Sequence, residues 1–356
     1  MKIITIIGAR PQFIKAAVVS HTFSSMPGNI HEVLIHTGQH YDSNMSKVFF
    51  DELNILAPSY NLAIGGGTHG QNTGRMIEKI EAVLLKERPD WVLVYGDTDS
   101  TLAGAIAAVK LHIPIAHVEA GLRSFNRRMP EELNRVLTDH TADLLFTPTD
   151  IASQNLMNEG ISLRQIHQVG DVMYDAALFY AERAKEHSSI LKQLDISSKS
   201  YVLATVHRAE NTDNPIRLRS ILDGFAASQT SIIWPLHPRT RDKISDYSLK
   251  LPDNILIIEP LGYLDMVMLE RHASVIATDS GGVQKEAYFY GVPCVTLRDE
   301  TEWVELVNCG MNSLVGTDSD KIANLLSIPS MPVEYTDSLY GDGKASQAIA
   351  SALINY

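Results

Sequence analysis

The stretch Ala277–Tyr290, which has the sequence ATDSGGVQKEAYFY, joins a short apolar run to a helical pattern through a glycine turn. The apolar run ends at Ala277, and Val283, Ala287 and Tyr290 then recur at the spacing of one helix face. A strand, a tight turn and the N-terminus of a helix are therefore predicted in direct succession. This succession is the building block of a doubly wound α/β fold.

The turn Ser280-Gly281-Gly282 is also a candidate anion site. Two glycines let a ligand approach the backbone closely, and the unpaired amides of the first helical turn favour negative charge. A diphosphate is the simplest ligand of this kind. Plain helix capping is the alternative for such a turn, so the turn by itself does not decide between the two.

Short apolar runs with helical patterns between them recur along the chain. They are Ile3–Ile7, Val33–Ile35, Trp91–Tyr95, Ile115–Val118, Leu144–Phe146, Tyr201–Thr205, Ile232–Trp234, Ile255–Ile258, Val275–Ala277 and Cys294–Leu297. Because each run is continuously apolar and does not alternate, the runs predict strands that are buried on both faces of a parallel sheet.

The chain length predicts more than one domain, because 356 residues exceed the size at which one hydrophobic core keeps growing. We expect two Rossmann-like, doubly wound α/β domains that face each other across a cleft, at residues 1–170 and 171–344. The last helical pattern, at residues 345–356, is expected to dock on one of them, and the first domain is the candidate.

The composition excludes several classes of protein. Hydrophobic residues make up 45% and charged residues 20% of the chain, as in an ordinary globular protein. The net charge of −12 argues against a nucleic acid or an anionic membrane as partner, because both bind positive surfaces. No run of 18 apolar residues occurs, and Arg10-Pro11 interrupts the apolar start too early for a signal peptide. With only Cys294 and Cys309 as thiols, a cytoplasmic protein is expected.

Charged residues follow the predicted strands, where ligands bind in open α/β sheets. Arg10 and Lys15 follow the first strand, Asp97 and Glu119 follow two later ones, and His207 follows the first strand of the second half. Each of them could instead have a purely structural role, for example as a helix cap or as a buried, hydrogen-bonded histidine. Their convergence on one cleft favours acid/base chemistry on a phosphorylated substrate.

Other chemistries fit less well. His36, His40 and Asp42 lack a further zinc ligand that can be placed, so no metal is expected. Ser280 lacks the first glycine of a hydrolase elbow, and the first turn lacks the GxGxxG of a dinucleotide site. The remaining set pairs diphosphate-binding groups with proton-transfer carboxylates: Arg10, Lys15 and Ser280–Gly282 with Asp97, Glu119 and Glu131.

Taken together, the motifs closely resemble those of the non-hydrolysing UDP-N-acetylglucosamine 2-epimerases, nearly from end to end. The matching segments are Gly8–Pro11 with Lys15, Gly96–Thr98, His117–Arg123, Pro130–Arg135, His207-Arg208, Thr278–Gly282 with Glu286, and Arg298–Glu302. The resemblance implies a GT-B-type fold, a homodimer, a UDP-sugar substrate and no cofactor.

The resemblance also implies roles for single residues. The nucleotide diphosphate and the sugar would be contacted by Arg10, Lys15 and His207. Phosphate would bind at Ser280, Gly281 and Gly282, and the ribose would be held by Glu286. The catalytic residues would be Asp97, Glu119, Glu131 and His207. Members of the family eliminate UDP across C1–C2 to form a glycal and then add UDP back after the other face is protonated.

The chain departs from the common family pattern at one motif. The usual Thr-Glu-Arg-Pro-Glu is replaced by Thr301-Glu302-Trp303-Val304-Glu305, so an arginine has become an indole. Together with Met266, the segment Ser124–Met129 and Gln284-Lys285-Glu286, this change makes the chain resemble the subgroup that acts on UDP-2,3-diacetamido-2,3-dideoxy-glucuronic acid and gives the manno epimer for O-antigen assembly. Arg127 or Arg128 is then a candidate for the sugar carboxylate, unless both are solvated loop residues.

Three other functions remain open at this point. The chain could epimerise UDP-N-acetylglucosamine itself, act as a GT-B glycosyltransferase, or bind a sugar nucleotide as a non-catalytic sensor. Asp97, Glu119, Glu131 and His207 together argue against the sensor, because binding a dianion does not require three carboxylates nearby.

Overall fold

The computed structural model describes residues 1–26, 30–38, 57–327 and 339–356. The chain divides into two compact units, Met1–Phe179 with Asp337–Tyr356, and Tyr180–Thr336. The boundary expected at residues 170 and 171 falls just before α7 (Val172–His187), a helix that begins in the first unit and ends in the second. Within the described residues, no helix is long and apolar enough to cross a membrane.

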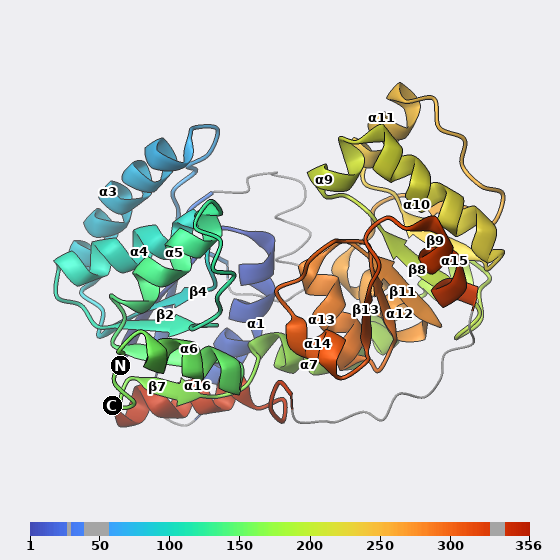
Figure 1. Cartoon of the computed structure of the whole chain (residues 1–356). Helices are drawn as coiled ribbons and strands as arrows, with labels where there is room; N and C mark the ends of the chain where they lie inside the picture. Colours follow the sequence, from blue (N-terminus) through green and yellow to red (C-terminus); the bar gives the residue numbers. More distant parts are fainter. Residues whose placement is uncertain (27–29, 39–56, 328–338) are drawn as a thin grey trace. The chain divides into compact units, whose positions relative to one another are not determined.

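The first unit is built on a seven-stranded parallel sheet with the order β3-β2-β1-β4-β5-β6-β7. Its strands are β1 (Lys2–Ile7), β2 (His31–His36), β3 (Tyr60–Asn61), β4 (Trp91–Tyr95), β5 (Ile115–Val118), β6 (Leu144–Thr147) and β7 (Ile166–Gln168). Helices cover both faces (Figure 1). They are α1 (Arg10–Ser25), α3 (His69–Glu87), α4 (Asp99–Lys110), α5 (Pro130–Asp139), α6 (Asp150–Asn158) and α16 (Ala345–Asn355).

The second unit repeats this design on a six-stranded parallel sheet with the order β10-β9-β8-β11-β12-β13. Its strands are β8 (Val202–Thr205), β9 (Ile232–Pro235), β10 (Ile255–Ile258), β11 (Val275–Thr278), β12 (Cys294–Thr296) and β13 (Asn312–Leu314). Its helices are α8 (Ile190–Gln193), α9 (Ala209–Thr212), α10 (Pro215–Ser228), α11 (Pro238–Asp246), α12 (Tyr263–His272), α13 (Gly281–Phe289), α14 (Val304–Asn308) and α15 (Ser319–Ser327).

The continuous apolar runs form strands with both faces buried. In β8, Val202 and Ala204 belong to one buried cluster, whereas the neighbouring Leu203 belongs to a second cluster on the opposite face. A strand covered by helices on both faces has no solvent face that would select polar residues at every second position. The predicted fold class, two Rossmann-like doubly wound domains, is confirmed.

The sequence did not predict three short strands, β3, β7 and β13. Each of them contains only two or three residues, includes polar side chains and pairs with a single neighbour at the edge of a sheet. An edge strand is partly exposed, so its sequence carries little of the apolar signal that marks a central strand.

The C-terminal helix α16 packs on α1 in the first unit (Figure 1). The carboxylate of Asp175 on α7 caps its N-terminus, because Oδ1 accepts the N–H of Ala345 at 3.0 Å and Oδ2 accepts that of Ser346 at 2.8 Å. The Ser346 hydroxyl lies 3.0 Å from that of Thr22 on α1. These bonds anchor the end of the chain to its beginning.

Replacing Asp175 with alanine removes both acceptors, and we expect the free energy of unfolding to fall by about 1–2 kcal/mol. Urea denaturation followed by circular dichroism measures the change. Glu186→Ala, at an exposed carboxylate on the same helix, is the matched control and is expected to change the free energy by less than about 0.5 kcal/mol. Equal stability of the two variants would show that the cap does not anchor α16.

Candidate functional site

Gln12 joins the turns that follow β1 and β4. Its side-chain oxygen accepts the N–H groups of Gly8 and Ala9 at 2.7 and 3.0 Å. Its Nε2 donates to the carbonyl of Tyr95 at 2.7 Å. Because Gln12 is buried and binds backbone groups of both turns, the two strand ends are held in one fixed arrangement.

The first turn has no room for a side chain. A Cβ on Gly8 would collide with the hydroxyls of Ser100 and Thr37, which explains why glycine occupies this position. Arg10, a candidate nucleotide contact, begins α1, but its side chain lies outside the described part of the structure.

Lys15 on α1 and Glu119 after β5 form an ion pair beside Gly96. Their side chains are only 9% and 11% exposed. A Cβ on Gly96 would lie 3.3 Å from Glu119 Oε2 and 3.8 Å from Lys15 Nζ, so the pair lies directly against the β4–α4 turn. A mostly buried charge depends on its partner. Lys15 therefore holds one of the predicted acid/base carboxylates in place.

The backbone of Glu119 is also unusual, with φ at +69°. A residue with a side chain is disfavoured in this left-handed region by about 1–2 kcal/mol, and such strain persists only where neighbouring structure enforces it. Here the N–H groups of Glu119 and Ala120 both donate to the carbonyl of Phe146 at 3.1 Å. The neighbouring strand β6 thus holds Glu119 in a conformation that is typical of functional sites.

Asp97 forms an ion pair with Arg135 on α5, and its side chain is 32% exposed. The carbonyl of Asp97 accepts Nδ2 of Asn134 at 2.9 Å, and the same amide donates to Asp99 at 3.1 Å. Helix α5 therefore fixes both the backbone and the carboxylate of Asp97. Glu131 lies in the first turn of the same helix and is exposed.

Arg135 also holds Glu132, whose Oε2 accepts Nη1 at 2.7 Å. The Glu132 carboxylate accepts the N–H of Ser124 at 2.9 Å and that of Phe125 at 2.9 Å, and this fixes the loop after β5. Burial would raise the pKa of Glu132, but Ser124 and Arg135 outweigh burial and hold the pKa below its ordinary value. One guanidinium thus connects Asp97 to the loop that carries Arg127.

The loop bounds a hollow of about 310 Å³ that Glu132 and Val136 of α5 also line. Phe125 stands at its edge with φ at +57° and a side chain that is 76% exposed. Arg127 also lines the hollow, and Arg128 is exposed next to it. The two arginines proposed for a sugar carboxylate are therefore both accessible.

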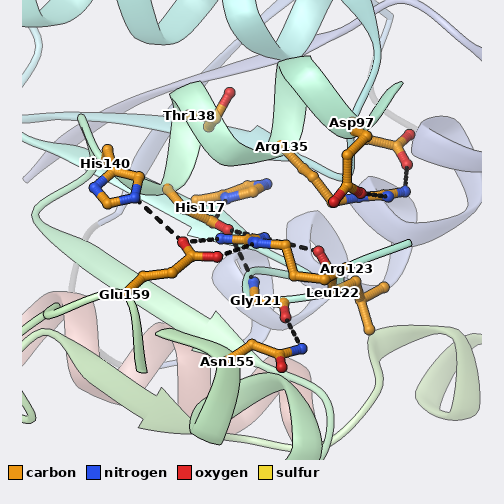
Figure 2. Close-up of polar contacts among 12 residues, drawn as sticks. Asp97, His117, Gly121, Leu122, Arg123, Arg135, Thr138, His140, Asn155 and Glu159 are labelled. Atoms are coloured by element: carbon orange, nitrogen blue, oxygen red, sulfur yellow. Dashed lines mark hydrogen bonds and ion pairs between the residues drawn. The ribbon is translucent and has the colours of Figure 1, made fainter. Parts of the chain in front are cut away.

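A chain of charged side chains runs from the hollow into the sheet (Figure 2). The guanidinium of Arg123 donates to both oxygens of Glu159 at 2.7 and 2.8 Å and to Asp139 Oδ2 at 2.7 Å. Asp139 Oδ1 lies 2.7 Å from His117 Nδ1, and His117 Nε2 lies 2.7 Å from the Gly96 carbonyl oxygen. The chain therefore ends at the turn that carries Asp97.

In the second unit, Asp279 joins the turns after β8 and β11. Its fully buried carboxylate accepts the N–H groups of His207 and Arg208 at 3.1 and 3.0 Å and Nδ2 of Asn211 at 3.1 Å. His207 is exposed, and its ring centroid lies 6.4 Å from that of His237. Asp279 thus ties the predicted His207 contact to the predicted phosphate turn.

Helix α13 begins at Gly281, directly after Ser280. Within the described residues, the Ser280 side chain makes no capping hydrogen bond, so simple capping does not account for this turn. A Cβ on Gly281 would collide with Glu302 Oε1 and would lie 3.4 Å from Trp303 Nε1. An anion that approaches Gly281 therefore meets the motif in which this chain departs from the common pattern.

Trp303 and Glu302 both have cationic neighbours. The Lys285 ammonium lies 4.3 Å from the centre of the Trp303 ring, and both side chains are buried. Glu302 accepts Nη1 of Arg298 at 2.8 Å. Burial would raise the pKa of Glu302, but the Arg298 charge outweighs burial and holds the pKa below its ordinary value. A carboxylate and an indole thus lie against Gly281, and each of them has a cationic neighbour.

Glu286, the candidate ribose contact, lies further along α13. Its side chain is buried, and the Tyr263 hydroxyl donates to its Oε1 at 3.3 Å. The structure therefore places Ser280, Gly281, Gly282 and Glu286 on one helix and its preceding turn, with Trp303 beside them.

Sequence reasoning missed the residues that position the others. Gln12, His117, Glu132, Arg135 and Asp139 were not proposed as functional, although His117, Glu132 and Arg135 lie within recognised motifs. A buried polar residue beside a strand-end turn is the signal that could have identified them. His40 and Asp42, which were considered for a metal site, lie outside the described residues.

Known proteins share the sequence and the fold of this chain over nearly its whole length. A model of the family described as UDP-N-acetylglucosamine 2-epimerase matches residues 25–354. The UDP-2,3-diacetamido-2,3-dideoxy-D-glucuronate 2-epimerase of Pseudomonas aeruginosa is 54% identical over 99% of both chains. The UDP-N-acetylglucosamine 2-epimerase of Methanocaldococcus jannaschii is 46% identical over 99% of both. A crystal structure of the latter, in complex with UDP-GlcNAc and UDP, matches with a TM-score of 0.89 and 45% identity over all of both chains.

The adjacent residues Glu131 and Glu132 provide a matched test of the loop anchor. We expect Glu132→Gln to lower the free energy of unfolding by about 2–4 kcal/mol, because a neutral amide replaces a buried carboxylate that binds two amides and a guanidinium. The exposed Glu131→Gln is expected to stay within about 0.5 kcal/mol of the wild type in urea denaturation.

The stability difference should also depend on pH. Because the folded-state pKa of Glu132 is lowered, its stabilising contribution is present above the ordinary glutamate pKa and is lost as the pH falls through the lowered value. The wild type and Glu132→Gln should therefore converge in acid. A stability difference that does not change with pH would contradict the ionised anchor.

Proposed function

The chain belongs to the UDP-N-acetylglucosamine 2-epimerase family, and from this premise we propose that it inverts C2 of UDP-2,3-diacetamido-2,3-dideoxy-glucuronate to give the manno epimer. The observation that carries the choice of substrate is the 54% identity, over nearly the whole chain, to the Pseudomonas aeruginosa enzyme of that name. UDP-N-acetylglucosamine is the alternative substrate, supported by the 46% identity to the Methanocaldococcus jannaschii enzyme and by the 56% identity to a Methanococcus maripaludis protein described as a UDP-N-acetylglucosamine 2-epimerase homolog.

The chemistry of the substrate supports an elimination and re-addition. A C2–H bond beside an acetamido group is not acidic, so inversion requires a redox group or an activated bond at C1. UDP is a good leaving group at C1, and its loss across C1–C2 gives a glycal that can be protonated from either face. This route requires no cofactor, because UDP that stays bound is added back in the second step.

The diphosphate is proposed to bind at Ser280–Gly282. The amides at the start of α13 and the helix dipole favour the negative charge that develops on UDP, and one well-aimed donor is worth about 3–4 kcal/mol in such a step. Arg10, Lys15 and His207 are proposed to contact the diphosphate and the sugar, and Glu286 is proposed to accept the ribose hydroxyls.

Asp97, Glu119 and Glu131 are proposed to transfer the protons, together with His207. Inversion at one carbon needs a proton carrier on each face or one carrier that moves. The carboxylates differ in their surroundings, since Asp97 pairs with Arg135, Glu119 pairs with the buried Lys15, and Glu131 is exposed. Such differences support separate roles for the three groups.

Substrate choice is proposed to depend on the exposed loop and on the indole. A glucuronate adds a carboxylate at C5 of the sugar, and Arg127 or Arg128 can supply the cation that binds it. Trp303, with Lys285 on its ring, takes the place of the arginine that is common in the family.

The proposal includes a cytoplasmic homodimer, as is common in the family. A single monomeric species in sedimentation velocity would contradict the dimer.

The proposed reaction can be tested in deuterium oxide with each sugar nucleotide alone. We expect proton NMR to show the manno epimer of UDP-2,3-diacetamido-2,3-dideoxy-glucuronate with deuterium at C2. Arg127→Gln and Arg128→Gln should identify the carboxylate contact by a KM about tenfold higher for this substrate. If only UDP-N-acetylglucosamine were turned over, the proposed substrate would be wrong. Epimerisation without deuterium at C2 would contradict the proposed elimination mechanism.

The proposed proton carriers make a second prediction. Asp97→Asn and Glu131→Gln should each lower kcat by about 10²–10⁴-fold while the circular dichroism spectrum is retained. Asp150→Asn, at an exposed carboxylate in the first turn of α6, is the control and should leave kcat unchanged. Near-normal kcat in either site variant would exclude that residue as a proton carrier.

A further inference from the structure

His117 on β5 is completely buried, and both of its ring nitrogens face hydrogen-bond partners. Nε2 lies 2.7 Å from the carbonyl oxygen of Gly96, and Nδ1 lies 2.7 Å from Asp139 Oδ1. A carbonyl oxygen can only accept, so Nε2 must carry a hydrogen. The remaining question is whether Nδ1 donates to Asp139 or accepts from it.

Asp139 is surrounded by donors. Its Oδ2 accepts the N–H of Gly121 at 3.1 Å and Nη1 of Arg123 at 2.7 Å. A guanidinium and an amide that both donate to one carboxyl oxygen stabilise the ionised form of that group. As a carboxylate, Asp139 can only accept, so Nδ1 of His117 also carries a hydrogen.

We propose that His117 is a buried imidazolium and that it is a positioning residue for the proton-transfer site. It donates through one nitrogen to Asp139 and through the other to the peptide that precedes Asp97. The part of this inference that concerns Asp97 rests on the proposed function, whereas the protonation of His117 does not.

The balance of charge supports the imidazolium. From the hollow inward, the side chains are Glu159, Arg123, Asp139 and His117, and each is bonded to the next (Figure 2). With a positive His117 the signs alternate and the chain is neutral. With a neutral His117 the chain would carry an uncompensated negative charge in a place where Asp139 is fully buried, which is unfavourable.

The hydrogen bond to Gly96 fixes the turn from which Asp97 extends. The N–H of Gly96 donates to the Val118 carbonyl at 2.9 Å, and its own carbonyl accepts from His117, so both sides of this residue are held. Gly96 has φ at +62°, which any other residue would adopt only with strain. His117 therefore determines where the Asp97 carboxylate lies relative to Arg135.

The imidazolium also places a fixed positive charge beside the proton carriers. Among the described residues, the charged and titratable groups in this network are Asp139 on α5, Arg123 after β5, Glu159 after α6 with His140, Asp97 and Glu132 with Arg135, and Lys15 with Glu119. A positive charge at this point favours the ionised form of the carboxylates that exchange protons with the substrate.

The protonation can be measured directly on the wild-type protein. With histidine labelled by ¹⁵N, long-range ¹⁵N–¹H spectra at pH 8 should show one of the 13 histidines with both ring nitrogens protonated. Exposed histidines are neutral at that pH. A spectrum in which all 13 rings are neutral would overturn the proposal, and this result would not depend on any substrate.

The role in catalysis requires a variant that separates charge from packing. His117→Gln keeps an N–H for the Gly96 carbonyl but removes the positive charge. We expect kcat to fall by about 10–100-fold, because the substitution misplaces the Asp97 carboxylate. KM should change less than about threefold, because the nucleotide still binds in its normal position. The acid limb of the kcat profile should move to higher pH, because the charge that favoured ionised carboxylates is gone.

His167→Gln is the matched control, because His167 is a half-buried histidine on β7 of the same sheet. It should leave kcat and its pH profile unchanged. A purely structural role for His117 would reduce the folded fraction of His117→Gln without moving the pH profile of the folded enzyme. That outcome would overturn the positioning role, whereas absence of epimerase activity in the wild type would overturn only the proposed function.

Discussion

Hydrogen bonds between buried side chains and the turns at strand ends are the constraint on which both units depend. The peptide groups that follow each parallel strand lie in a region that helices shield from water. These groups therefore need hydrogen-bond partners within the protein. In the first unit Gln12 and His117 provide them, and in the second unit Asp279 provides them. Gln12 and Asp279 each join two turns from different strands, and His117 joins the turn after β4 to Asp139 on α5, so the positions of the candidate functional groups are coupled.

The same constraint explains why the candidate groups occur as pairs. Lys15 with Glu119 and Arg135 with Asp97 bring opposite charges together at places where a single charge would be costly. A substrate that carries a diphosphate adds negative charge, and elimination of UDP increases it on the leaving group. Preorganised cations and amides stabilise this charge without having to reorganise during the reaction, which is how such sites lower barriers. Family membership and the local geometry therefore support the same chemistry.

The second unit contains the edge at which related enzymes are proposed to differ in substrate without a change in fold. Trp303 and Glu302 lie against Gly281, at the start of the helix that is proposed to bind the diphosphate. An indole with an ammonium on its face differs from a guanidinium in shape and hydrogen bonding, although a positive charge remains nearby. Substitutions at this edge can alter recognition of the sugar, because the sheet and the Asp279 anchor do not depend on them.

The sequence by itself determined the two doubly wound sheets and the family, and it identified the turns that are proposed to carry function. Central parallel strands must be apolar on both faces, and glycines and charged residues directly after such runs lie at the sheet edge where ligands bind. The tertiary structure alone decided which carboxylate pairs with which cation, and it revealed His117, Asp139 and Glu132 as positioning groups. Lys15 and Glu119 are separated by 104 positions, and they meet only because β1, β4 and β5 are neighbours in the sheet. Strand order and burial create these pairs, and neither leaves a local pattern in the sequence.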